Sequence, residues 1–504
     1  MDKQKSLLNV SVSVGFKILT MAMVVVVKRF LILNCGNDVN GLNALYLSII
    51  GFLSVAELGV GSAITFCMYK PIVAGDKDTV SALYRLFRKI YLLIGGVILV
   101  CGLVITPFIT VFAKDYAQLD VNFYLTFVLM LLSVVITYLY SCKTSLINAY
   151  KNNYITTAIT SSGLMLQYVL QIVTLLTTHS FVWYLICRIV AALAQWVATE
   201  VTVRRNHTDI LNNPNKKIEG PVKKELLKNI KAMFMHSVGY VLVNSVGNVV
   251  ISAFIGVGVL GLYSNYTMIL TSLTEVLKLV FTSLTSVIGH LYVESNRQTT
   301  KRYCENFHLL NFVLGCVFFL GYYAVADNLI ALLFSEELII DKTIVLVLTI
   351  NGFVQFMRQS TLVFRQATGT FYHDRWKPLF EGIANVVLAI VLVQWIGVAG
   401  VLVATITTNL VICHIVEPFV LYKNAFDMSP KQYYLKNYGL IVLFCVALGL
   451  LRSIMQSYDS QWKTFLVNGF VSVGISVIVC GIILLLHRDL CKQLLAGIKK
   501  RLKR

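Results

Sequence analysis

The sequence has few charged residues and few prolines for its length. Only 13% of its 504 residues are charged, against about 25% in an average soluble domain, and seven are proline. So little charge cannot keep the surface of a soluble protein in water, and so few prolines argue against a long disordered module. The chain is instead 57% hydrophobic, with a mean hydropathy of +0.75. We therefore expect an all-α polytopic membrane protein.

The sequence also lacks the motifs of a metal site or a catalytic centre. Its eleven cysteines form no CxxC pair, and it contains no nucleophile motif and no Gly-rich phosphate loop. We therefore expect no catalytic residue, no metal and no cofactor, and we do not expect an enzyme. The lysines near the N-terminus precede an apolar run without a small-residue cleavage site, which indicates an uncleaved first span.

Fourteen stretches are long and apolar enough to cross a membrane. If the N-terminus and every second loop share one side, that side carries 33 of the 43 Lys and Arg residues and the other side only four. The positive-inside rule then places both termini in the cytoplasm, and the net charge of +19 reports topology rather than a nucleic-acid partner. The predicted spans are 7–33, 44–68, 90–111, 121–141, 155–177, 181–202, 233–255, 260–290, 309–326, 343–364, 379–395, 398–421, 437–456 and 464–486.

The two halves of the chain repeat at an offset of 220 residues. Gly41 aligns with Gly261 and Tyr46 with Tyr266, and the offset preserves the order of the spans. Because each repeat has six spans, the two lobes share one orientation, related by a pseudo-twofold axis along the membrane normal, which is typical of alternating-access transporters. We predict an N-lobe at 1–203, a basic cytoplasmic linker at 204–231, a C-lobe at 232–423, and two extra helices with a basic cytoplasmic tail at 424–504.

Basic residues within the spans are the first candidates for a binding site. Charge at membrane depth normally faces a cavity or a partner. Lys17 and Lys28 are 11 residues apart, so they share one helix face. For Lys28 and Arg29, snorkelling to the outer headgroups is an equal alternative. With Lys278 and Arg358 from the second half, these bases predict a central cavity for an anion such as a pyrophosphate.

Polar residues recur on one face of two later spans. In the eighth span Thr271, Glu275, Lys278 and Thr282 are spaced by 4, 3 and 4, although Glu275 and Lys278 are also close enough to pair with each other. The tenth and seventh spans add polar groups to the predicted cavity, namely Asn351, Gln355, Arg358 and Arg365 from the tenth and Asn244 and Asn248 from the seventh.

Two acids complete the predicted site. Glu57 of the second span and Glu275 suit either a coupling H⁺ or Na⁺ or an intramembrane ion pair, with Lys17 as the expected partner of Glu57. Glu381 follows Pro378 at a helix start, where capping of the helix is favoured. Arg188 and Glu417 have no partner that helical spacing can identify.

Two regions resemble one family of transporters. Residues 41–49, GLNALYLSI, lead into AELGVGSAI at 56–64 and Tyr69-Lys70-Pro71, and in the second half RQATG at 365–369 precedes Asp374-Arg375 and Pro378-Leu379. In these motifs the chain resembles Wzx-type polysaccharide-biosynthesis flippases of the multidrug/oligosaccharidyl-lipid/polysaccharide (MOP) exporter superfamily.

The resemblance implies a fourteen-helix transporter of the bacterial inner membrane. Such a protein flips an undecaprenyl-diphosphate-linked oligosaccharide from the cytoplasmic to the outer leaflet, for a surface polysaccharide such as O-antigen or capsule. It also implies that the last two helices form a groove for the lipid tail. The partners expected are the lipid-linked oligosaccharide, membrane lipids and other polysaccharide-assembly proteins, and we expect a monomer.

Two other functions compete with this interpretation. A cation-coupled multidrug exporter of the same superfamily would favour an acidic, aromatic pocket, and the excess of basic residues in the spans argues against it. A membrane glycan polymerase or ligase would need a sizeable external loop, whereas the longest external loop expected is only about 327–342.

Overall fold

The computed structural model describes residues 3–57, 60–115, 117, 119–211, 241–243 and 245–486. Within these ranges the secondary structure is helical and contains no strand. Ten helices of this part of the chain are long and apolar enough to cross a membrane. The predicted class, an all-α multi-pass membrane protein, is confirmed.

The chain forms two compact units. Unit 1 comprises Met1–Gly261 and Pro378–Val386, and unit 2 comprises Leu262–Lys377 and Val387–Arg504. The boundary at Gly261 lies within a helix. Of the predicted basic linker, residues 212–231 lie outside the described part of the chain. The predicted limits of the two lobes remain a prediction.

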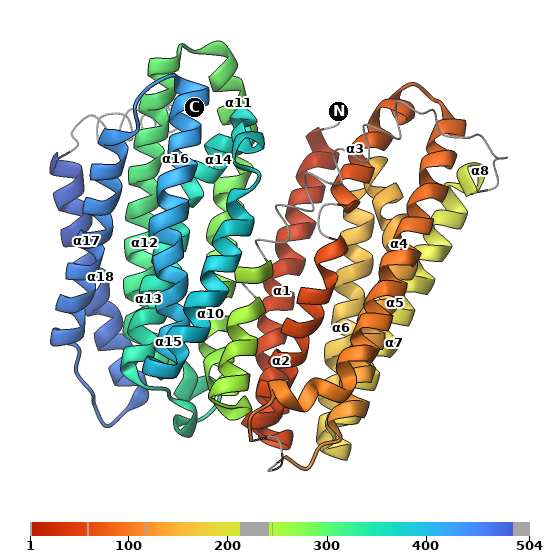
Figure 1. Ribbon diagram of the computed structural model, residues 1–504, viewed down its shortest axis with the longest axis horizontal. Coiled ribbons are helices and arrows are strands. Elements are labelled where there is room, and N and C mark those ends of the chain that lie inside the picture. Colours follow the sequence, from red (N-terminus) through yellow and green to blue (C-terminus); the bar gives the residue numbers. More distant parts are fainter. Residues whose placement is uncertain are drawn as a thin grey trace. The chain divides into compact units, whose positions relative to one another are not determined.

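Unit 1 is a bundle of long helices (Figure 1). Helix α5 packs against α4 and α7, and α6 packs between α1 and α7. Its helices are α1 (Lys3–Cys35), α2 (Asn37–Leu53), α3 (Val60–Val73), α4 (Lys77–Ile105), α5 (Phe123–Ala149), α6 (Asn153–Thr178), α7 (Phe181–Asn206), the short α8 (Thr208–Leu211) and an apolar helix at Val241–Phe254.

Unit 2 is built around α12, the longest helix described in this unit. Helix α12 packs against α13, α17 and α18, and α17 and α18 lie side by side (Figure 1). The helices that lie wholly or partly in this unit are α10 (Val257–Ser283), α11 (Thr285–Glu294), α12 (Arg297–Leu333), α13 (Lys342–Met357), α14 (Gln359–Thr368), α15 (Lys377–Thr408), α16 (His414–Leu421), α17 (Lys431–Ile454) and α18 (Gln461–Leu486).

Each predicted span has a helical counterpart in the described residues, but several are interrupted. A 3₁₀ turn at Ser54–Glu57 separates α2 from α3 within the second span. The tenth span breaks at Arg358, between α13 and α14. The division predicted between spans eleven and twelve is present inside α15, where the backbone is non-helical at Ile396 and at Gly397, whose φ of 60° favours glycine. A π-helix at Asn409–Cys413 joins α15 to α16.

Polar residues at the helix ends fix where several helices begin. Asp76 accepts the Thr79 N–H at the start of α4, at 2.9 Å. Asp341 accepts the Thr343 N–H at 2.7 Å at the start of α13, and this hydrogen bond lowers the pKa of Asp341. Each acceptor satisfies one of the backbone N–H groups that have no partner in the first turn of a helix. The sequence thereby marks the ends of apolar runs with short polar side chains.

A close contact joins α2 to the first turn of α10 inside unit 1. Asn37 donates to the Gly258 carbonyl at 2.8 Å, and a Cβ added at Gly41 would lie 2.0 Å from the Val257 carbonyl oxygen. A Cβ added at Gly261 would lie 2.4 Å from the Asn37 carbonyl oxygen. The offset of 220 residues relates Asn37 to Val257 and Gly41 to Gly261, so the second close approach is the first with the two segments exchanged. The segments therefore contact each other reciprocally, as segments related by a twofold axis do.

Substitution of Gly41 by Ala should destabilise the protein. The added methyl group would overlap backbone atoms of α10, and overpacking of this kind costs about 1–3 kcal/mol. The matched control is Gly96→Ala in α4, where a Cβ meets nothing within 4 Å. Thermal unfolding in detergent should show a lower Tm for Gly41→Ala and an unchanged or slightly raised Tm for the control. Equal Tm values for the two variants would contradict the close contact.

Candidate functional site

The predicted polar face of α10 is uncovered in the structure. Thr271 and Thr282 are exposed, and the side chains of Glu275 and Lys278 are 44% and 45% exposed. Lys278 Nζ lies 3.8 Å from Glu275 Oε1, so the two form the pair that their spacing allows. An ion pair this exposed contributes little stability, about 0–1 kcal/mol. Lys278 can therefore change partner at small cost.

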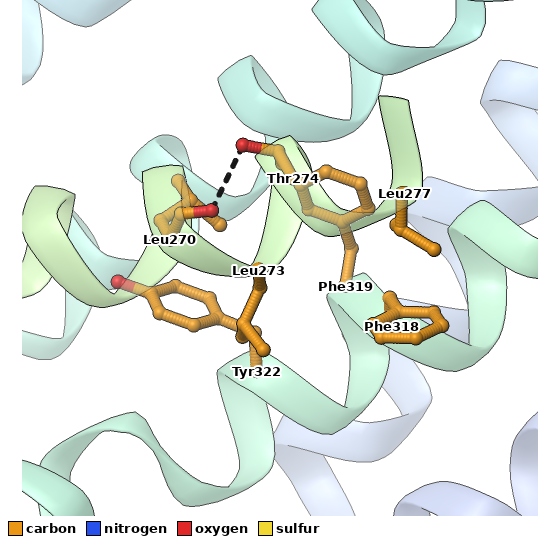
Figure 2. A pocket seen from close by; sticks show the side chains of 7 residues that line it. All are labelled: Leu270, Leu273, Thr274, Leu277, Phe318, Phe319 and Tyr322. Atoms are coloured by element: carbon orange, nitrogen blue, oxygen red, sulfur yellow. Dashed lines mark hydrogen bonds between the residues drawn. The ribbon is translucent and has the colours of Figure 1, made fainter. Parts of the chain in front are cut away.

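A different face of α10 packs on α12. Figure 2 shows Leu273, Leu277 and Phe319 lining a shallow apolar hollow with a cavity volume of about 10 Å³. The Thr274 hydroxyl at its edge already donates to the Leu270 carbonyl at 3.0 Å (Figure 2). A hollow this small holds less than the roughly 300–1,000 Å³ of a typical ligand pocket. It is a packing feature, and it leaves the polar face as the side of α10 available for function.

Unit 1 carries the other basic candidates. Lys28 is half-buried and Arg29 exposed on α1, and Glu57 is half-buried in the 3₁₀ turn after α2. The side chain of Lys17 lies outside what the structure describes, so its pairing with Glu57 stays a prediction.

The structure describes only one of the two asparagines that were predicted to line the site from the seventh span. Asn248 donates to the Ser48 hydroxyl of α2 at 2.9 Å, which gives it a partner within unit 1. Asn244 lies outside the described residues. In unit 2, Gln355 donates to Asn351 at 3.2 Å, so these two residues of the predicted face also contact each other.

Arg358 lies in a buried ion cluster that the sequence did not predict. Its guanidinium donates to both carboxylate oxygens of Glu417, Nε to Oε2 at 3.1 Å and Nη2 to Oε1 at 2.5 Å. Its third nitrogen, Nη1, donates to Asn409 Oδ1 at 2.6 Å. Because guanidinium and carboxylate are both planar, this two-point contact fixes the orientation of the pair as well as their separation.

Two more cations reach the same carboxylate. Lys377 Nζ donates to Glu417 Oε1 at 2.6 Å, and Arg365 Nη1 lies 3.8 Å from the same oxygen. Arg365 also pairs with Asp374. We call Arg358, Arg365, Asp374, Lys377, Asn409 and Glu417 the Glu417 cluster.

Exposure within the Glu417 cluster is uneven. The side chains of Glu417, Arg365 and Lys377 are 2%, 4% and 6% exposed, whereas that of Arg358 is 17% exposed. A charge buried this deeply without a partner would cost too much free energy. Each of these side chains can therefore remain ionised only beside its oppositely charged partners. Arg358 is therefore the most accessible of the cations that surround this carboxylate.

Polar contacts also join α16, which carries Glu417, to its neighbours α13 and α17. His414 Nε2 donates to the Val354 carbonyl at 3.0 Å, and Asn437 donates to His414 Nδ1 at 3.0 Å. These two contacts assign His414 as a neutral imidazole with its proton on Nε2. His308 of α12 contacts the Ser360 hydroxyl at 2.8 Å. These contacts tie α16 to α13 and α17, and α12 to α14.

Sequence reasoning placed two of the six residues of this cluster in the predicted site. Arg358 and Arg365 were placed on one face by their spacing of seven, and both contact Glu417. Glu417 and Lys377 were missed because their partners lie 59 and 40 residues away in sequence, beyond what helical periodicity can relate. The RQATG segment, which contains Arg365, was the one local signal at this place.

The arrangement suits electrostatic binding of an anionic group. Among the residues that the structure describes, no group of three or more His, Cys, Asp or Glu side chains could hold a metal ion. The cations of α10 and of the Glu417 cluster can bind an anionic group, and the guanidinium of Arg358 can do so at two points.

Replacing Glu417 by Gln should destabilise the protein strongly. The change leaves Lys377 and Arg358 buried beside an amide, and removal of one partner from a buried pair costs about 3–5 kcal/mol. Glu275→Gln is the matched control, because it removes an exposed carboxylate with a single cation and should cost at most about 1 kcal/mol. Chemical unfolding in detergent measures both, and a similar loss in the two variants would argue against the compensation described here.

The chain matches known proteins in fold but not in sequence. No family model and no curated protein sequence matches it. Its fold is similar to that of a multidrug resistance MATE family transporter of the MOP superfamily in an inward-facing conformation, with 14% identity and a TM-score of 0.65 over 86% of this chain and 98% of that one.

Two further solved structures share the fold. The lipid II flippase MurJ in an inward closed conformation has 12% identity and a TM-score of 0.66, over 96% of this chain and 100% of that one. A mutant of the Vibrio cholerae MATE transporter VcmN has 15% identity and a TM-score of 0.54, over 86% and 99% of the two chains. The chain therefore has the fold of the solved MATE and MurJ transporters over most of its length.

Proposed function

We propose that the protein is a transporter that flips an undecaprenyl-diphosphate-linked oligosaccharide by alternating access. The observation that carries the proposal is the uncovered polar face of α10, where Lys278 and Glu275 form a weak, exposed pair on a helix otherwise apolar enough to span a membrane. Such a face needs a polar partner at membrane depth. A diphosphate-linked sugar supplies both anionic and hydroxyl groups.

The balance of charge in unit 2 favours an anionic substrate. Glu417, the most deeply buried acid of the Glu417 cluster, is held by Arg358, Lys377 and Arg365, so it offers no site to an organic cation. Lys278 is more readily available to a ligand. This contrast supports a diphosphate rather than a cationic drug, and it ranks a cation-coupled multidrug exporter second.

The fold comparison supports the same order. The flippase MurJ covers 96% of this chain and the inward-facing MATE transporter 86%. A flippase fold therefore accounts for more of the chain than the fold of that drug transporter does. We propose no enzymatic activity, and a membrane glycan polymerase or ligase ranks third.

The remaining parts of the proposal follow the sequence. Lys17, Lys28 and Arg29 bind the headgroup with Lys278 and Arg358, while Thr271, Asn244, Asn248 and Gln355 contact the sugars. Glu57 or Glu275 takes the coupling H⁺ or Na⁺. We propose that the protein is a monomer in the bacterial inner membrane with both termini in the cytoplasm, supplying other polysaccharide-assembly proteins.

The last two helices suit the lipid tail. Large apolar side chains of α18 are exposed in the structure, among them Trp462, Phe470 and Val477. Exposed apolar groups on a spanning helix are compatible with acyl or isoprenoid chains. We propose that α17 and α18 contact the undecaprenyl tail.

Charge reversal at Lys278 should abolish flipping. In proteoliposomes that contain a fluorescent undecaprenyl-diphosphate-linked sugar, Lys278→Glu should reduce the flipping rate at least about tenfold, because it places two carboxylates where the diphosphate binds. Lys278→Arg keeps the charge and is the matched control. The measurement is the rate at which the sugar becomes accessible to a membrane-impermeant reagent.

The same preparation separates the rival functions. Normal flipping by folded Lys278→Glu would contradict the role of the α10 face. Transport of a lipophilic cation by the wild-type protein without flipping would favour the multidrug exporter. Formation of longer glycans by the purified protein would favour the polymerase or ligase.

A further inference from the structure

Arg358 is held in a way that differs from an ordinary buried ion pair. A carboxylate with a single buried cation cannot release it, because the remaining charge would be left without compensation. Glu417 has three cations within 4 Å, and two of them, Lys377 and Arg365, are almost fully buried. Glu417 therefore stays compensated if Arg358 leaves.

The backbone near Arg358 also permits a change of partner. Arg358 lies at the junction of α13 and α14, where its N–H bonds to the Gln355 carbonyl at 3.4 Å in place of a regular helical bond. On the other side, Glu417 belongs to a helix of eight residues flanked by the π-helices Asn409–Cys413 and Tyr422–Phe426. Irregular helical turns of this kind commonly occur at functional sites.

We infer that Lys377 is a positioning residue that makes Arg358 available to an anionic headgroup. Without substrate, Arg358 is docked on Glu417 and Asn409. When a diphosphate arrives, Arg358 transfers its two-point contact from the carboxylate to the phosphate oxygens, while Lys377 and Arg365 keep Glu417 compensated. Lys377 acts through Glu417 and does not touch the ligand. The inference rests on the proposed function for the identity of the anion.

Removal of Lys377 should trap Arg358. In Lys377→Met, Glu417 depends on Arg358 for its strongest remaining contact, so Arg358 should be released less easily. The affinity for farnesyl diphosphate, measured by calorimetry in detergent, should fall about tenfold or more. The double variant Lys377→Met/Glu417→Gln removes the carboxylate that holds Arg358 and should restore the affinity to within about threefold of wild type.

The matched control is Lys342→Met. Lys342 also pairs with a carboxylate of unit 2, Asp327, at 2.7 Å, but it lies outside the Glu417 cluster. Its removal should leave the affinity for farnesyl diphosphate unchanged. Because removal of both partners of a buried pair can also repair stability, the affinity of each variant is read together with its Tm, and rescue of affinity without a change in Tm separates positioning from a structural role.

A second measurement does not depend on the ligand. Phenylglyoxal modifies accessible guanidinium groups, and mass spectrometry of peptides can quantify its reaction at Arg358. Modification should be slower in Lys377→Met than in wild type and faster in the double variant. The same rate in all three proteins would overturn the inference.

The two measurements distinguish failure of the inference from failure of the proposed function. Suppose that the wild-type protein does not bind farnesyl diphosphate but the phenylglyoxal rates follow the expected order. This result would contradict a diphosphate substrate but support the inference that Lys377 controls how tightly Glu417 holds Arg358. Binding by Lys377→Met at wild-type affinity would overturn the inference. A folded double variant that stays as weak as Lys377→Met would overturn it also, since Lys377 would then act on the ligand directly.

Discussion

The constraint on which this structure depends is the cost of placing charge where water is scarce. Only 13% of the residues are charged, and unit 2 shows two contrasting settings for those within its spanning helices. The Glu417 cluster surrounds a buried carboxylate with cations from α14, α15 and the α13–α14 junction. The α10 face instead leaves Lys278 and Glu275 open. The charge of Glu417 is compensated by several cations, whereas Lys278 and Glu275 form only a weak pair. Both arrangements reflect the free-energy cost of charge at membrane depth.

The features predicted from sequence are those that depend on near neighbours in the chain. Runs of apolar residues identified the spans because a helix needs only length and hydropathy to cross a membrane. The α10 face was visible because spacings of 4 and 3 place side chains on one side of a helix. The Glu417 cluster was not visible, since Arg358 and Glu417 are 59 residues apart and meet only when several helices pack.

Two of the interruptions in the helices were hidden from hydropathy for a related reason. Averages over about 20 residues remain high across a single irregular turn, so Ser54–Glu57 and Arg358 did not divide the predicted spans, whereas the break at Gly397 lies between the predicted spans eleven and twelve. Two of these three breaks coincide with a charged residue. A helix break frees backbone groups and changes the direction of the chain, which allows a charged side chain to reach partners that a straight helix would not offer.

The two charged settings would act at different stages if the protein carries an anionic headgroup. Lys278 has one exposed partner, so a ligand can engage it with little loss of existing contacts. Arg358 has two contacts with Glu417 and one with Asn409, so a ligand must first replace three hydrogen bonds. A group that only weakly resembles a diphosphate can satisfy the first requirement but not the second. Discrimination among anions then depends on Arg358, and the capture of an anion depends on the α10 face.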